Sequence, residues 1–135
     1  MTRGGVVIAT PTLPQGPHDR ALALARSADS RKAEDIVLLD LRGRASFCDS
    51  FLICSASSRR QVRAIAEGLV KDLRAVGVNP IGVEGLEASR WVLIDFGDVI
   101  AHVFDAPLRD FYDLEGLWSD VPRVRLSLDV PAVNA

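Results

Sequence analysis

Two apolar runs of equal length, residues 91–96 and 99–104, flank the dipeptide Gly97-Asp98, and this pattern constrains the fold more than any other. Glycine at the first central position suits a type II′ turn, so the pattern predicts a two-residue β-hairpin. In that register Trp91 pairs with Phe104, and Phe96 pairs with Val99. The hairpin therefore aligns six residues of each strand.

Side chains alternate between the two faces of a strand, so the register assigns each residue to a face. One face is wholly apolar and must lie in the core: Val92, Ile94, Phe96, Val99, Ala101 and Val103. The other face is mixed: Trp91, Leu93, Asp95, Ile100, His102 and Phe104. Any polar site on the hairpin is expected on this mixed face.

A long amphipathic helix is predicted over residues 58–76. Ser58 stands three residues before Gln61, which is the spacing of a capping box. The apolar residues that follow recur with a 3.6-residue period, and Gly77 occupies the position expected of a C′ glycine. They are Val62, Ile65, Ala66, Leu69, Leu73 and Val76.

The remaining elements are shorter. Apolar runs predict buried strands at 35–41 and 50–56, and a third strand is predicted at 80–84. Weaker patterns predict helices at 20–31, after Asp19 as N-cap, and at 108–118. These elements predict one α/β domain over residues 19–118, with a mixed sheet of about five strands and flanking helices. Residues 1–18 are interpreted as a flexible tail, and residues 119–135 as an irregular C-terminal tail.

Composition limits location and cofactors. No apolar run approaches the ~20 residues that span a bilayer, and 6–9 is too short for a signal peptide, so we expect a cytoplasmic protein without a membrane partner. The chain has two cysteines, two histidines and no Cys-x-x-Cys pair, so no zinc site is expected. We predict no metal and no cofactor, and Cys48 and Cys54 as free thiols.

Charge is distributed unevenly along the chain. Residues 20–83 carry eleven Lys and Arg against seven Asp and Glu, whereas residues 84–120 carry nine acids against Arg90 and Arg109. An acidic half suits a basic protein better than a phosphate backbone, which requires cations. Solvated surface is the simpler interpretation of the same asymmetry.

The loop before the long helix is a generic anion site, because Ser55–Ser58 precede a helix N-terminus and Arg59, Arg60 and Arg63 follow. No glycine-rich phosphate motif accompanies it. The simpler interpretation is that Ser58 caps the helix and the arginines are solvated.

Two further features raise the question of catalysis. Asp95 and His102 are diagonal neighbours in the hairpin, but no nucleophile elbow accompanies them, so a hydrogen-bonded pair that fixes the register is favoured. Paired carboxylates for a catalytic metal are also missing, since Asp95 and Asp98 straddle the turn. For Trp91 the sequence leaves core packing and an interface role equally open.

Motifs along residues 34–118 resemble the Iojap-related ribosomal silencing factors. They comprise DIVLLDL, Cys48-Asp49-Ser50-Phe51 leading into FLICSASSRRQV, GVEG at 82–85, WVLIDFGD at 91–98, His102-Val103-Phe104, and Arg109 with FYDLE and Leu117-Trp118. Ser50 departs from the large residue usual in that family. Each motif alone is weak, but their order and spacing together are specific.

The resemblance implies a fold similar to nucleotidyltransferases without their catalytic motifs, and a protein that is not an enzyme. It implies binding to the large ribosomal subunit through ribosomal protein fourteen, which blocks association with the small subunit and silences translation under nutrient limitation. A role in large-subunit biogenesis and a homodimer are also implied, without sequence-specific nucleic-acid binding. The expected partner-binding residues are Trp91, Asp95, Asp98, His102, Arg109 and Tyr112. The alternative function is a nucleotide-binding or nucleotidyltransferase-like enzyme.

Overall fold

The computed structural model describes residues 19–126. In chain order the elements are α1 (Asp19–Ser30), β1 (Glu34–Asp40), β2 (Ser50–Ala56), α2 (Arg59–Ala75), β3 (Gly82–Glu84), β4 (Trp91–Asp95), β5 (Val99–Asp105), α3 (Ala106–Tyr112) and α4 (Leu114–Leu117). No helix in this part of the chain is long and apolar enough to cross a membrane.

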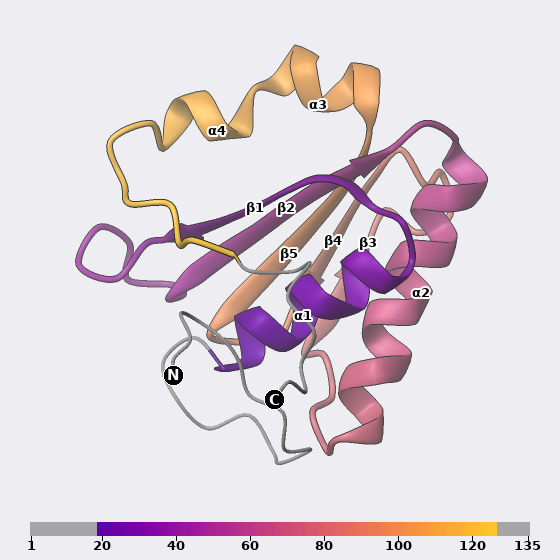
Figure 1. Ribbon diagram of the computed structural model, residues 1–135, viewed down its shortest axis with the longest axis horizontal. Helices are drawn as coiled ribbons and strands as arrows, with labels where there is room; N and C mark the ends of the chain where they lie inside the picture. The colour runs from indigo at the N-terminus through magenta and orange to yellow at the C-terminus, as the bar shows by residue number, and fades with distance from the viewer. Residues whose placement is uncertain (1–18, 127–135) are drawn as a thin grey trace.

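The five strands form one mixed sheet in the order β1-β2-β5-β4-β3 (Figure 1). β2 and β5 run parallel in the middle of the sheet, and the other neighbours are antiparallel. The predicted mixed sheet of five strands is therefore confirmed. A mixed sheet covered on both faces keeps its central strands buried, and every residue of β2 is buried.

The hairpin has the predicted register. Trp91 pairs with Phe104, Asp95 pairs with Ile100, and the Phe96 N–H donates to the Val99 carbonyl at 2.9 Å. Gly97 has a φ of 96°, which a side chain would disfavour, so glycine is required at this point of the turn. The face predicted to be apolar is at most 2% exposed.

α2 begins as the sequence predicts, because Ser58 Oγ accepts the Gln61 N–H at 3.1 Å. The reciprocal half of the capping box is absent: the Gln61 side-chain amide donates to the Lys32 carbonyl at 3.2 Å, which ties α2 to the end of α1 instead. Beyond the helix, the Val78 N–H donates to the Leu73 carbonyl at 2.8 Å, so the C-terminus of α2 is also capped.

The sheet separates two hydrophobic cores. α1 and α2 cover one face, where they bury the apolar side of the hairpin, and α3 and α4 lie over the other (Figure 1). The second core is smaller and contains Phe51, Ile53 and Phe104, with Trp91 and Trp118 packed against it. The mixed face of the hairpin therefore points toward α3 and α4.

The single helix predicted over 108–118 is wrong, because two short helices replace it. Asp113 takes the left-handed conformation, with φ 46° and ψ 54°, and ends α3. Its carboxylate then accepts the Gly116 N–H at 3.2 Å and caps α4. Aspartate tolerates this conformation better than most residues, so a periodic pattern alone does not reveal the break.

The described part of the final segment, residues 119–126, runs along the outer edge of β1. The Asp40 N–H donates to the Pro122 carbonyl at 2.9 Å, and the Val124 N–H donates to the Leu38 carbonyl at 2.8 Å. Val121 is buried in the second core. The predicted domain boundary at 118 and both predicted tails stay predictions, since residues 1–18 and 127–135 lie outside the described residues.

Candidate partner-binding surface

Trp91 lies half-buried on the mixed face of the hairpin, at the first residue of β4 and beside the point where β5 leads into α3. Its ring stacks on Phe104, with centroids 4.8 Å apart and planes inclined by 28°. Tyr112 at the end of α3 covers it from the other side, with a centroid distance of 5.0 Å. Trp91 therefore belongs partly to the core and partly to the surface.

His102 lies beside Trp91 and is buried. Its Nδ1 accepts the indole N–H of Trp91 at 3.1 Å, while its Nε2 is buried without a hydrogen-bond partner within residues 19–126. Burial lowers the pKa of His102 from 6.5 to about 4, because the apolar surroundings disfavour the imidazolium. The imidazole is therefore neutral at pH 7.

The predicted hydrogen bond between Asp95 and His102 is wrong. Asp95 Oδ1 accepts the Gly97 N–H at 2.8 Å, so this carboxylate stabilises the turn, and His102 pairs with Trp91 instead. Both residues lie on the predicted face. A short carboxylate beside a tight turn finds a backbone donor two residues ahead, and this local bond competes with the cross-strand one.

α3 is positioned by its N-cap. Asp105 Oδ1 accepts the Leu108 N–H at 3.0 Å, and Pro107 suits the first turn. The other carboxylate oxygen of Asp105 accepts from Arg90 Nε at 3.2 Å, which links the cap to the residue before Trp91. The helix then places Tyr112, 49% exposed, over Trp91, and leaves Phe111 76% exposed.

Arg109 points from α3 into the protein, not toward the surface. Its guanidinium donates to both carboxylate oxygens of Glu115, at 3.0 and 3.1 Å, and to Ser55 Oγ at 3.0 Å. The hydrogen bonds from Arg109 lower the pKa of Glu115. In a continuous helix, residues six apart lie on different faces, so the break at Asp113 is what brings Glu115 to Arg109.

The six predicted partner-binding residues do not form one surface. Trp91, His102 and Tyr112 are in contact, and Arg109 fastens the helix that carries Tyr112. Asp95 lies four residues along β4 from Trp91, about 13 Å at 3.3 Å per residue. Asp98 is in the turn beyond it, where it accepts from Arg20 of α1 at 3.1 Å. Their roles in binding stay predictions.

Among residues 19–126, the sequence did not predict the exposure of five large apolar side chains: Phe47 (58%), Ile81, Val83, Phe111 and Leu117 (75%). Phe47 contacts Phe51 and Trp118 at the far end of the second core. Leu117 lies beyond the break at Asp113, so the periodicity of one continuous helix over 108–118 does not predict which face it occupies. One sequence signal could have indicated the exposure of Phe111: it is a large apolar residue beside Tyr112 in a segment rich in Asp and Glu.

Both cysteines of the chain are free and buried. Burial raises the pKa of Cys48 to about 11 and that of Cys54 to about 12, so both thiols are protonated at neutral pH. In residues 19–126 no three His, Cys, Asp or Glu side chains gather as metal ligands would. What the arrangement does present is an aromatic pair, Trp91 and Tyr112, beside the exposed carboxylates of Asp110 and Asp113.

Comparison with known proteins points to a single family. The family model described as "Ribosomal silencing factor during starvation" matches residues 14–135. A ribosomal silencing factor from Halalkalibacterium halodurans is 47% identical over 110 residues, which are 81% of this chain and 94% of that protein. A mouse protein named "Mitochondrial assembly of ribosomal large subunit protein 1" is 30% identical over 104 residues, 75% of this chain and 44% of that one.

Comparison with solved structures finds proteins of similar fold. The crystal structure of a protein from Chromobacterium violaceum, 32% identical, superposes with a TM-score of 0.76 and covers 89% of this chain and 98% of its own. Sequence and structure therefore agree over nearly the whole described domain.

Proposed function

The chain belongs to the family of ribosomal silencing factors, and on this premise we propose that it represses translation by binding the large ribosomal subunit through the surface around Trp91 and Tyr112. The proposed partner is ribosomal protein fourteen of that subunit, at the face where the small subunit docks. Occupation of this face blocks subunit joining by steric exclusion. The setting is the cytoplasm under nutrient limitation.

The observation that carries the proposal is the exposure of Tyr112 over half-buried Trp91. Interface hot spots are enriched in tryptophan and tyrosine. Asp110 and Asp113 flank the pair on exposed positions, and residues 84–120 carry an excess of acids. Such a surface complements a basic ribosomal protein.

In this proposal the protein acts by binding and not by chemistry. The expected similarity to nucleotidyltransferases would then concern the fold alone. The mouse relative has the large ribosomal subunit in its name, which supports the same partner and a part in large-subunit assembly. Self-association into a homodimer is a further expectation of the family resemblance.

Sedimentation with separated ribosomal subunits tests the proposal. The parent protein is expected to sediment with large subunits and to stay in the supernatant with small subunits. Because Tyr112 is 49% exposed, we expect Tyr112→Ala to change folding stability much less than a buried aromatic would. A hot-spot aromatic truncated in this way costs about 2 kcal/mol of binding or more, roughly thirty-fold in affinity.

Ile81→Ala is the matched control, because Ile81 is 73% exposed and its N–H donates to the Asp95 carbonyl, at the opposite end of β4 from Trp91. It is expected to bind large subunits as the parent does. Equal binding of the parent to both subunits, or a Tyr112→Ala variant that binds like the parent, contradicts the proposed surface.

A further inference from the structure

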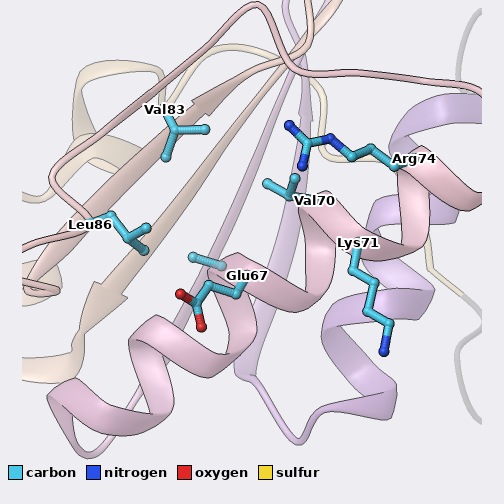
Figure 2. Close-up of a pocket in the computed structure, with 7 residues that line it drawn as sticks. Glu67, Val70, Lys71, Arg74, Val83 and Leu86 are labelled. Atoms are coloured by element: carbon cyan, nitrogen blue, oxygen red, sulfur yellow. The ribbon is translucent and has the colours of Figure 1, made fainter.

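A groove separates α2 from β3 on the sheet face opposite Trp91. α2 packs over β4 and β5, so the side chains of β3 are left without a helix above them. The groove has a volume of about 500 Å³ and is lined by Ala66, Glu67, Val70, Lys71, Arg74, Val83 and Leu86 (Figure 2). This volume lies within the ~300–1,000 Å³ range of ligand clefts.

The floor of the groove is aliphatic. Figure 2 shows Val70 from α2 facing Val83 from β3, with Leu86 from the following loop beside them. Val83 is 39% exposed, although it pairs with Ile94 and so points toward the sheet face that α1 and α2 cover. An apolar floor in a groove of this size favours an occupant with aliphatic side chains.

A cation stands at one end of the groove. The Arg74 side chain extends from α2 toward Val83, whereas Lys71 points away (Figure 2). Glu67 is paired with Arg63 at 3.2 Å, but Arg74 has no ion pair within residues 19–126. The occupant is therefore expected to bring a carboxylate to Arg74.

β3 is the last strand of the sheet, and its outer edge pairs with nothing in the described part of the chain. An open strand edge is a template for an extended peptide, whose alternate side chains then point to one face. No aromatic side chain lines the groove, so it lacks the stacking platform that single-stranded nucleic acid uses. A polypeptide fits this combination better than RNA.

We propose that the groove docks an extended segment of a partner protein, which adds a strand to β3, places aliphatic side chains between Val70 and Val83, and sets a carboxylate against Arg74. This interaction goes beyond the proposed function, because the groove and the Trp91–Tyr112 surface lie on opposite faces of the sheet. Both partners can bind at once.

Nuclear magnetic resonance titration of the full chain tests the proposal with a synthetic nine-residue peptide that alternates valine with threonine and ends in two aspartates. Shifts are expected in the amides of 82–84 and 66–74. The same peptide ending in two lysines is expected to bind at least tenfold more weakly. Arg74→Glu should reverse this preference, and Arg60→Glu, on the same helix but outside the groove, should leave it unchanged.

Two further measurements keep the surfaces apart. Tyr112→Ala should bind the aspartate peptide like the parent, and Arg74→Glu should sediment with large subunits like the parent. Peptide binding by Tyr112→Ala would support the groove as a separate site even if the parent protein did not sediment with large subunits. Loss of peptide binding in Tyr112→Ala overturns the separation of the two surfaces.

Other occupants give other outcomes, each of which overturns the proposal. Equal shifts of the same amides by polyuridylate would indicate RNA as the occupant. Self-association that Val83→Asp abolishes would indicate a second copy of this chain. Peptide binding that occurs only when residues 127–135 are replaced by a glycine–serine segment would indicate the chain's own C-terminal segment. Absence of any shift at millimolar peptide also overturns it.

Discussion

Trp91 donates its indole N–H to Nδ1 of His102 across the β4–β5 hairpin, at 3.1 Å. The bond fixes the imidazole as the tautomer that carries its proton on Nε2. It also holds the indole ring flat on Phe104, so that Tyr112 can cover its outer side. A buried polar pair thus sets the orientation of the proposed binding aromatic.

Trp91→Phe keeps an aromatic ring on Phe104 but removes the donor, which leaves Nδ1 of His102 buried and unpaired. We expect the free energy of unfolding to fall by about 1–3 kcal/mol. In a double-mutant cycle with His102→Phe, the double variant should lose less than the sum of the two single losses. Simple additivity in urea unfolding would contradict the coupling.

Stability is expected to fall in mild acid because of His102. Its pKa is about 4 in the folded protein against 6.5 ordinarily, so between these values the unfolded chain binds the extra proton. The contribution is fully present above pH 6.5 and is lost as the pH falls to 4, by about 3 kcal/mol at ~1.4 kcal/mol per pH unit. Urea unfolding from pH 7.5 to 4 measures it.

His102→Phe is the control for this titration, since it should flatten the profile between pH 6.5 and 4.5. Below pH 4.5 a second loss is expected from Glu115, whose pKa is lowered by Arg109 and whose protonation breaks their ion pair. A slope that persists in His102→Phe above pH 4.5 would assign the effect to another group.

Two buried serines should respond in opposite directions to the same substitution. Ser50 is fully buried and its Oγ finds no hydrogen-bond partner among residues 19–126, so Ser50→Ala should stabilise the protein by about 1 kcal/mol. Ser55 Oγ accepts from Arg109, so Ser55→Ala should cost about 1–3 kcal/mol. Thermal denaturation at constant pH compares the two variants with the parent. If both thermal midpoints shift in the same direction, the prediction is wrong.

Gly85 and Gly82 form a second matched pair. Gly85 has a φ of 84°, and a Cβ there would lie 2.2 Å from the Trp91 carbonyl oxygen, so Gly85→Ala should cost about 1–3 kcal/mol or more. Gly82 has open space around it, and Gly82→Ala should change stability by less than about 1 kcal/mol. Equal thermal midpoints would show that the loop yields without strain.

The fold was predictable where local rules and packing agree. The alternation in residues 91–104 fixed both the register and the buried face, because a one-residue slip would expose the whole apolar set. The N-cap at Ser58 was likewise predictable, because a serine three residues before a glutamine, as Ser58 is before Gln61, is typical of a helix N-terminus.

The candidate site was less predictable, because its contacts depend on backbone geometry that no period reveals. Arg109 reaches Glu115 only because Asp113 adopts the left-handed conformation. His102 bonds to Trp91, two positions away diagonally, since Asp95 is satisfied by the turn. The groove beside β3 arises because α2 packs over β4 and β5. This placement is set by tertiary packing and not by a local sequence pattern.

The parallel pairing of β2 with β5 sets the order in which the chain can fold. Ser50 lies opposite Val99, so the two central strands are separated by α2, β3 and β4 in the sequence. Local contacts can form α2 and both hairpin strands early, but the sheet closes only after this long loop is ordered. The rate-limiting step of folding is therefore expected to be the docking of β5 beside β2, with α3 and α4 added last.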